Sequence, residues 1–171
     1  MKIFLVGFMG SGKTRLGKNL SNALERNFID LDVLIEHTQH ISIPEIFAAK
    51  GEQGFREIEK NTLQHSAFAE DSIISTGGGA PCFFDNMDWM NKNGITIFID
   101  PPIKVLADRL INAKTERPLI KGKSLDELVI FIEEKLKERR PFYEKATLSL
   151  TSVSLTPEIV IQALKDNNLS F

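Results

Sequence analysis

Short apolar runs alternate with amphipathic stretches along the whole chain. The apolar runs predict five strands, at residues 2–6, 28–30, 72–76, 95–99 and 148–150, and the strands at residues 2–6 and 95–99 are expected to be buried. Between them, apolar side chains recur every three or four residues and predict helices, at residues 13–24, 43–49, 55–69, 84–92, 102–110, 125–140 and 157–164. This alternation is typical of an α/β fold, in which helices cover both faces of a parallel sheet.

Breaks in the pattern predict where elements end. Gly51 is expected to end the helix at residues 43–49, and Pro141 is expected to lie just past the end of the helix at residues 125–140. Over residues 111–123 the apolar periodicity fails, which leaves a polar and basic segment between two helices. We find no internal repeat and no interdomain linker, so we expect one domain.

The first strand runs directly into a glycine-bearing turn and a helix. Residues 7–14, Gly-Phe-Met-Gly-Ser-Gly-Lys-Thr, match the phosphate-loop motif G-x-x-x-x-G-K-[ST] in full. Its glycines let backbone N–H groups approach phosphate oxygens, and the helix N-terminus favours the same anion. Lys13 can reach the β- and γ-phosphates, and the Thr14 hydroxyl can join a Mg²⁺ shell. We therefore expect a nucleoside triphosphate here.

Composition narrows the class of protein further. The chain has 171 residues, enough for a full core, and a formal net charge of −2 with acids and bases interspersed. Cys82 is the one cysteine, which excludes an internal disulfide. No signal peptide is visible, and no segment approaches the ~20 apolar residues that a transmembrane helix needs. We expect a cytoplasmic monomer with no nucleic-acid or membrane partner.

The phosphate loop alone does not separate a kinase from a switch GTPase or a motor. The guanine-reading signature Asn-Lys-x-Asp is missing, because Asn91-Lys92-Asn93 is followed by Gly94. The chain is also short for a motor core with partner-binding regions. A small-molecule kinase needs an acceptor pocket near the carboxyl ends of the parallel strands.

Two acidic residues follow the second predicted strand. Asp30 and Asp32 form an Asp-x-Asp there, so that one carboxylate can lie near a hydrated Mg²⁺ and the other can bind acceptor hydroxyls. The alternative is that Asp32 only caps a helix, where an acidic residue is favoured in any case. The sequence leaves both readings open.

Further candidates come from arginines and glycines. Arg56 can hold an anion, with Glu59 one helical turn away fixing its rotamer, although such pairs are more often surface pairs. The run Gly77-Gly78-Gly79 can let a ligand approach the backbone, or it can be a plain turn. Arg117, inside the polar segment, suits a lid that delivers a cation to the phosphates; otherwise it is an exposed loop arginine.

Together these segments resemble the shikimate kinase family over nearly the whole chain. The resemblance rests on the order and spacing of residues 7–14, Asp30-Leu31-Asp32, Phe55-Arg56-Glu57-Ile58-Glu59, Gly77-Gly78-Gly79, Arg117-Pro118-Leu119 and Arg139-Arg140-Pro141-Phe142-Tyr143. It implies one domain over residues 1–171 with the P-loop NTPase fold of nucleoside-monophosphate-kinase type. A shikimate-binding region would lie at about residues 31–61 and a lid at about residues 111–123.

The resemblance also implies an activity and a set of site residues. The activity is transfer of the ATP γ-phosphate to the 3-hydroxyl of shikimate, with Mg²⁺, in the biosynthesis of chorismate and aromatic amino acids. Catalysis would involve Lys13, Asp32 and Arg117, and Mg²⁺ would be held by Thr14 and, through water, Asp30. The ATP-binding residues would be Gly10, Ser11, Gly12, Lys13, Thr14, Arg15, Arg109 and Arg117. Shikimate would be bound by Asp32, Arg56, Gly78, Gly79 and Arg139, with Glu59 orienting Arg56.

Two departures from the family pattern concern adenine. The family often carries an adenine-stacking arginine near the start of the lid, where this chain has Leu110, with Arg109 one residue earlier. The family's loop after the last strand often has a basic residue, and residues 151–154 have none. The sequence therefore leaves the adenine contacts open. It also leaves two rivals: a gluconate kinase, with another acceptor pocket, and a regulatory ATP-binding module without catalysis.

Overall fold

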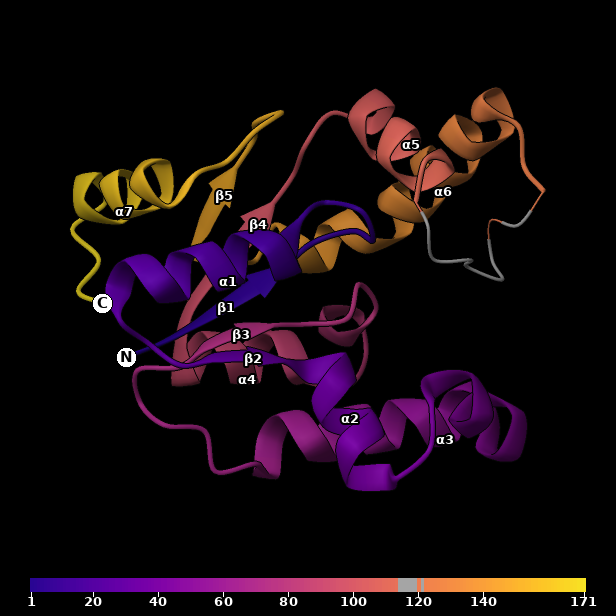
Figure 1. Ribbon diagram of the computed structural model, residues 1–171, viewed down its shortest axis with the longest axis horizontal. Helices are drawn as coiled ribbons and strands as arrows, with labels where there is room; N and C mark the ends of the chain where they lie inside the picture. The colour runs from indigo at the N-terminus through magenta and orange to yellow at the C-terminus, as the bar shows by residue number, and fades with distance from the viewer. Residues whose placement is uncertain (114–119, 121) are drawn as a thin grey trace.

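The centre of the molecule is a sheet of five parallel strands. The computed structural model describes residues 1–113, 120 and 122–171. The strands lie in the order β2-β3-β1-β4-β5, and every neighbouring pair is parallel (Figure 1). Their bounds are β1 Lys2–Val6, β2 Phe28–Asp30, β3 Ile73–Ser75, β4 Gly94–Ile99 and β5 Leu148–Leu150. The predicted five-stranded parallel sheet is confirmed.

Helices cover both faces of this sheet. They are α1 Lys13–Leu24, α2 Leu31–Gln39, α3 Ile43–His65, α4 Asn86–Asn93, α5 Ile103–Ile111, α6 Leu125–Tyr143 and α7 Pro157–Asp166, with a 3₁₀ turn η1 at Ala80–Cys82. Figure 1 shows α1 crossing in front of β1, whereas α4 lies behind the sheet. None of the helices in the described part of the chain is both long and apolar enough to cross a bilayer.

Alternation along β1 divides the apolar core between the two faces. Ile3 and Leu5 pack with apolar side chains of α1 and α7, whereas Phe4 and Val6 pack with those of α2 to α6. A strand that is buried on both sides needs apolar residues at successive positions, which explains the unbroken apolar run at residues 3–6. The larger core therefore lies on the face that carries α2 to α6.

The strand order brings the candidate segments to one edge. β1 is central and lies between β3 and β4. The connection after β1 leads to β2 on one side of it, and the connection after β3 leads to β4 on the other side. Because all strands are parallel, the segments after β1, β2, β3 and β4 leave the sheet at the same edge. The phosphate loop follows β1, Asp30 ends β2, and the glycine run follows β3. Ligands of such sheets bind where the connections diverge, which here is the end of β1.

A helix that the sequence analysis did not predict begins directly after β2. It is α2, and its capping residue is Asp30, whose side chain accepts a hydrogen bond from the Asp32 backbone N–H at 3.2 Å. The alternative that Asp32 caps this helix is therefore wrong. Asp32 lies in the first turn, which leaves its carboxylate available to the edge of the sheet.

Two other boundaries differ from the prediction. Gly51 does interrupt the helical conformation, with φ 68° and ψ −175°, but α3 resumes after it and ends at His65 rather than at Ala69. The predicted helix at residues 84–92 begins only at Asn86, because Phe84 has a left-handed φ of 53° and η1 precedes it.

The prediction that Pro141 lies past the end of its helix is wrong. Helix α6 continues through Pro141 to Tyr143, although proline cannot donate the helical hydrogen bond at its position. Tertiary contacts stabilise this last turn: the Tyr143 ring packs 5.0 Å from the Phe98 ring, and Arg140 Nη2 lies 2.9 Å from Asp100 Oδ1. Burial against β4 therefore outweighs the local preference of proline.

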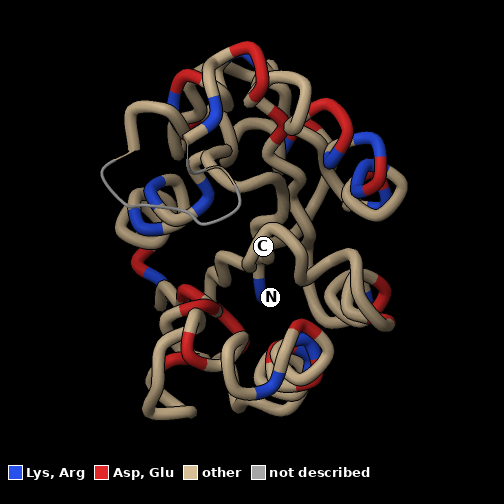
Figure 2. The backbone as a smooth tube through the Cα atoms, turned by 90° about the vertical axis from the view of Figure 1, so that its right-hand side faces the viewer, with Lys and Arg blue, Asp and Glu red and all other residues tan. Residues whose placement is uncertain are grey.

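Charged residues are distributed over the outer helices. Figure 2 shows basic and acidic positions interspersed along the backbone of the described residues. The exceptions that matter for function are the few charged side chains that are buried, Lys13, Arg56 and Glu59. They belong to the edge of the sheet where the parallel strands end.

Candidate active site

The turn between β1 and α1 is built to hold an anion. Gly10 and Gly12 have φ values of 79° and 98°. Residues other than glycine rarely adopt this left-handed backbone conformation. Gly12 is the N-cap of α1, and no side chain caps this helix. The first N–H groups of α1 are therefore directed at the turn without a side-chain acceptor, which is the usual arrangement of a phosphate site.

Lys13 lies inside this turn. It is 7% exposed, and its Nζ donates hydrogen bonds to the carbonyl oxygens of Gly7 at 2.8 Å and Phe8 at 2.9 Å. The loop thus wraps around a buried ammonium group at the N-terminus of α1. Both positive features, the ammonium group and the helix dipole, face the same position.

Thr14 and Asp30 connect this loop with the end of β2. The Thr14 hydroxyl donates a hydrogen bond of 2.8 Å to Oδ2 of Asp30, while the other carboxylate oxygen accepts from the Asp32 backbone. Hydroxyl and carboxylate oxygens are the ligand type that Mg²⁺ takes, usually one or two from protein beside water and substrate phosphates. This pair fits the position predicted for the metal.

A cavity of about 260 Å³ opens beside the phosphate loop. Arg109 spans it: Nη1 donates to the Ser11 carbonyl at 3.1 Å, and Nη2 donates to the Val153 carbonyl at 2.6 Å. The cavity is lined by Ser11, Gly12, Arg15, Leu16, Asn19, Ile99, Arg109, Ser152, Val153, Ser154 and Leu155.

Four residues predicted to bind ATP therefore share this cavity, namely Ser11, Gly12, Arg15 and Arg109. Asn19 and residues 152–155 also line the cavity, although no motif in the sequence indicates a role for them. The absence of a basic residue in residues 151–154 left this loop without a predicted role. A basic side chain does reach this loop from α5, because Arg109 donates a hydrogen bond to the Val153 carbonyl.

The three glycines after β3 leave room for charged side chains. A Cβ built on Gly79 would lie 2.5 Å from Nη2 of Arg56. A Cβ on Gly77 would lie 2.9 Å from Oδ1 of Asp32 and 3.0 Å from Oε1 of Glu59. A side chain at either position would displace these groups. The glycine run is therefore more than a plain turn, because side chains of α2 and α3 lie directly against its backbone.

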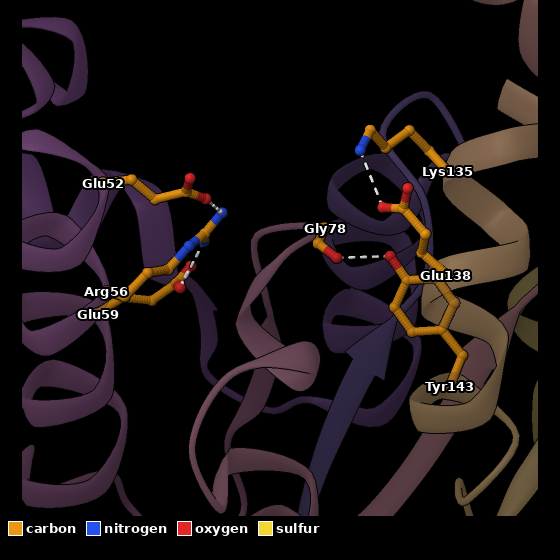
Figure 3. A network of polar contacts seen from close by, with 7 residues as sticks. All are labelled: Glu52, Arg56, Glu59, Gly78, Lys135, Glu138 and Tyr143. Atoms are coloured by element: carbon orange, nitrogen blue, oxygen red, sulfur yellow. Dashed lines mark hydrogen bonds and ion pairs between the residues drawn. The ribbon is translucent and has the colours of Figure 1, made fainter. Parts of the chain in front are cut away.

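Arg56 is buried, with an exposed fraction of 9%. Its Nη1 lies 2.7 Å from Oε2 of Glu59, and Nη2 lies 3.4 Å from Oε1 of Glu52 (Figure 3). The guanidinium carbon also lies 4.2 Å from the centre of the Phe83 ring. The alternative that Arg56 and Glu59 form an ordinary surface pair is wrong, since Glu59 is only 1% exposed. Phe83 and Glu52 had no predicted role. The Phe83 contact depends on the tertiary fold, whereas Glu52 lies four residues before Arg56 on α3 and is a local helical neighbour.

Burial sets the electrostatics of this cluster. It raises the pKa of Glu59 from 4.5 to about 7, because loss of solvation outweighs the attraction of Arg56. It also raises the pKa of Asp32, with a further contribution from the nearby Asp30 carboxylate. Among the described residues, Arg56 Nε and Glu59 Oε1 are buried polar atoms without a hydrogen-bond partner. Buried polar atoms are normally satisfied, so these two atoms make the cluster an unusual one for a purely structural ion pair.

Arg139 approaches the same glycines from the opposite side. It lies in the last turns of α6, half-buried, with its guanidinium carbon 5.4 Å from the centre of the Phe8 ring. A Cβ on Gly78 would lie 3.4 Å from Nη1 of Arg139 and 3.3 Å from the backbone N of Met9. The guanidinium groups of Arg139 and Arg56 therefore converge on Gly78 and Gly79, next to the phosphate loop.

Other predicted residues lie elsewhere. Arg140 points to β4, where it pairs with Asp100, so it is a structural residue of α6. Arg117 lies outside the described residues, as does most of the lid predicted at residues 111–123. Tyr143 is a residue whose role the sequence analysis missed. It lies four residues after Arg139, so it shares that face of α6, and its hydroxyl donates to the Gly78 carbonyl (Figure 3).

Glu59 gives a prediction for stability. Because its pKa is higher in the folded protein than the ordinary 4.5, the folded state holds a proton that the unfolded state has already released between pH 4.5 and about 7. The free energy of unfolding should therefore fall as pH rises through this window, by up to about 3 kcal/mol, and then level off. Urea denaturation of the wild type and Glu59→Gln from pH 5 to 8 measures this.

The difference in unfolding free energy between these two proteins is expected to decrease with rising pH. Glu57→Gln, an exposed change on the same helix, is the matched control and should show a constant difference from the wild type. A constant difference for Glu59→Gln as well would show that Glu59 titrates normally.

The parallel sheet and the phosphate loop after its central strand are typical of a P-loop phosphotransferase. The two guanidinium groups that lie against Gly78 and Gly79 fit an acidic acceptor. Residues 9–167 match the family model "Shikimate kinase". The chain is 53% identical to the shikimate kinase of Bacteroides fragilis over 85% of this chain and 82% of that protein. The chain belongs to the shikimate kinase family.

Solved structures agree with this family. The shikimate kinase of Bacteroides thetaiotaomicron is 45% identical, with a TM-score of 0.89 over 97% of both chains. The shikimate kinase of Acinetobacter baumannii, solved in complex with shikimate, is 30% identical, with a TM-score of 0.86 over 99% of this chain and 95% of that one. The predicted P-loop kinase fold is confirmed.

Proposed function

We propose that this chain transfers the γ-phosphate of ATP to the 3-hydroxyl of shikimate, in the biosynthesis of chorismate and aromatic amino acids. The observation that carries the proposal is the convergence of Arg56 and Arg139 on Gly78 and Gly79 beside the phosphate loop. Two guanidinium groups that converge on neighbouring glycines match a carboxylate, which an arginine binds through paired charge-assisted hydrogen bonds. Shikimate carries one carboxylate and vicinal hydroxyls.

Asp32 is the proposed partner of those hydroxyls. Its carboxylate lies against Gly77, one residue before the two glycines that would contact the ring. Its raised pKa makes it a better proton acceptor than an exposed aspartate, so it can take the proton of the attacking hydroxyl. Glu59 acts on the acceptor through Arg56, which it holds at 2.7 Å.

The proposed mechanism relies on position and charge. Phosphoryl transfer passes through a loose transition state, so neutralising the transferred group matters more than a strong base. Lys13 and the N-terminus of α1 would stabilise its charge, and Arg117 remains a prediction for the same role. Mg²⁺, when bound near Thr14 and Asp30, would supply further positive charge to the phosphates.

The acceptor can be tested with an ADP-release assay. Shikimate, gluconate and nucleoside monophosphates are supplied in turn with ATP and Mg²⁺, and phosphorus NMR identifies the product. We expect turnover with shikimate and a new phosphate ester at its 3-hydroxyl. Faster turnover with gluconate would refute the proposal, and no turnover with any acceptor would favour a regulatory ATP-binding module.

Arg109 gives a prediction for the nucleotide. Arg109→Ala removes the hydrogen bonds that join the phosphate loop to residues 152–155 across the cavity. The KM for ATP should rise about tenfold, equivalent to about 1.4 kcal/mol, while the KM for shikimate changes little. Steady-state kinetics with each substrate varied measures both constants. Lys104→Ala, an exposed change on α5, is the control. Equal increases in both KM values would show that Arg109 supports the fold instead.

A further inference from the structure

Tyr143 is buried at the end of α6, beside the glycine run. It is 0% exposed, and its ring packs against Phe98 of β4 at 5.0 Å. Its hydroxyl donates a hydrogen bond to the Gly78 carbonyl, as Figure 3 shows. The phenol is thus fixed at its ring by the sheet and reaches the glycine run with its one polar atom.

The three carbonyl groups of the glycine run accept hydrogen bonds from different kinds of donor, two from backbone N–H groups and one from a side chain. Gly77 accepts from the backbone N–H of Ala80 at 3.2 Å, and Gly79 accepts from the backbone N–H of Cys82 at 2.8 Å. Both bonds are local and belong to the turn into η1. Gly78 accepts instead from a side chain that is 65 residues away in the sequence. The orientation of its peptide group therefore depends on α6.

That peptide group joins Gly78 to Gly79. A peptide unit is planar and trans, so its carbonyl and its N–H point in opposite directions. Holding the Gly78 carbonyl toward Tyr143 directs the Gly79 N–H away from α6. A bond between two glycines is also among the easiest to rotate as a unit, because neither residue has a Cβ to restrict its φ and ψ.

We infer that Tyr143 is a positioning residue for the acceptor: its hydroxyl fixes the Gly78–Gly79 peptide so that the Gly79 N–H faces the acceptor pocket. The inference rests on the proposed function, in which these two glycines contact the shikimate ring. Arg139 lies on the same turns of α6, so the helix end carries both an acceptor-binding charge and the group that orients the acceptor-binding backbone.

Tyr143→Phe tests this, because it keeps the ring against Phe98 and removes only the hydroxyl. The KM and the dissociation constant for shikimate should rise about three- to tenfold, as expected for one lost hydrogen bond in the pocket, with the KM for ATP unchanged. In NMR spectra of glycine-labelled protein, the Gly79 amide resonance should broaden or shift in the variant, since the peptide would sample a second orientation.

Thr96→Val is the matched control. Thr96 is also buried, and its hydroxyl oxygen accepts a hydrogen bond of 2.8 Å from the Thr147 backbone N–H, away from the acceptor pocket. Both variants should unfold at a lower temperature, but only Tyr143→Phe should change the shikimate constants.

Equal effects of Tyr143→Phe on both substrates, or an effect on stability alone, would overturn the inference while leaving the proposed function intact. Failure of the wild type to phosphorylate shikimate would instead remove the proposed function, and the inference with it. Thermal unfolding of Tyr143→Phe shows that the kinetic comparison concerns folded protein.

Discussion

Replacing Lys13 with alanine should lower the turnover number by at least about a hundredfold while leaving the fold intact. The lysine supplies a full charge at the N-terminus of α1, where negative charge would develop on the transferred phosphoryl group. Removal of one preorganised group that stabilises such a transition state typically costs about 3 kcal/mol. Steady-state ADP release at saturating ATP and shikimate measures the loss, and circular dichroism monitors the fold.

The effect on stability should be smaller than the effect on turnover. Lys13 Nζ is bonded to the carbonyls of Gly7 and Phe8, so the variant loses some loop contacts, but the apolar core of α1 remains. Lys18→Ala, an exposed change on the same helix, is the control and should keep full turnover. Turnover of Lys13→Ala within a few-fold of the wild type would exclude the proposed role of the phosphate loop.

Replacing Arg56 with alanine should weaken shikimate binding by roughly thirtyfold or more, equivalent to about 2 kcal/mol. The variant loses a charge-assisted contact made by a side chain that is buried in the protein. It also leaves Glu59 without its ion-pair partner, and the pKa of this buried carboxyl should then rise further, so that it becomes protonated at neutral pH. Protonation limits the loss of stability, which makes the binding effect measurable in folded protein.

Calorimetric titration of shikimate into the wild type and the Arg56 variant measures this change. Lys60→Ala removes a positive charge from the same helix outside the pocket, and it should bind shikimate as the wild type does. The KM for ATP should stay within about twofold in both variants. Unchanged shikimate affinity in Arg56→Ala would make Arg56 a structural residue.

The parts of the fold that the sequence predicts well are those with strong local signals. The strands β1, β3 and β4 are short apolar runs whose burial on both faces requires that composition, and the phosphate loop is a contiguous motif. Asp30 ends β2, as its position after the apolar run predicts, and Asp32 lies in the first turn of α2. The roles of these residues as helix cap and as first-turn residue were not resolved, because both positions favour a carboxylate.

The parts that the sequence does not predict depend on distant contacts. Pro141 signals a helix end, but packing of Tyr143 on Phe98 and the pair of Arg140 with Asp100 extend α6 beyond it. Arg56 and Glu59 are three residues apart on a helix. This spacing is the same for an exposed pair and for a buried pair, so the sequence does not distinguish them. From the sequence alone, the glycine run can be a plain turn. In the fold, side chains from α2, α3 and α6 lie directly against its backbone, which explains the need for glycine.

The nucleotide cavity shows the same limitation. Its wall is formed by the N-terminal half of α1, by Arg109 of α5 and by residues 152–155, which are far apart in the chain. The family pattern leads one to expect basic residues at Leu110 and in the loop after β5, as two separate features. Only the fold shows that Arg109 reaches the Val153 carbonyl and so connects these segments.

In the proposed mechanism, guanidinium groups beside the phosphate loop bind the carboxylate of the acceptor. The most direct test compares shikimate with its neutral carboxamide in calorimetric titrations of the wild type and Arg56→Ala. The wild type should bind shikimate at least about thirtyfold more tightly than the carboxamide, and most of this preference should disappear in the variant. Equal affinity of the wild type for both compounds, or an undiminished preference in Arg56→Ala, would contradict the account.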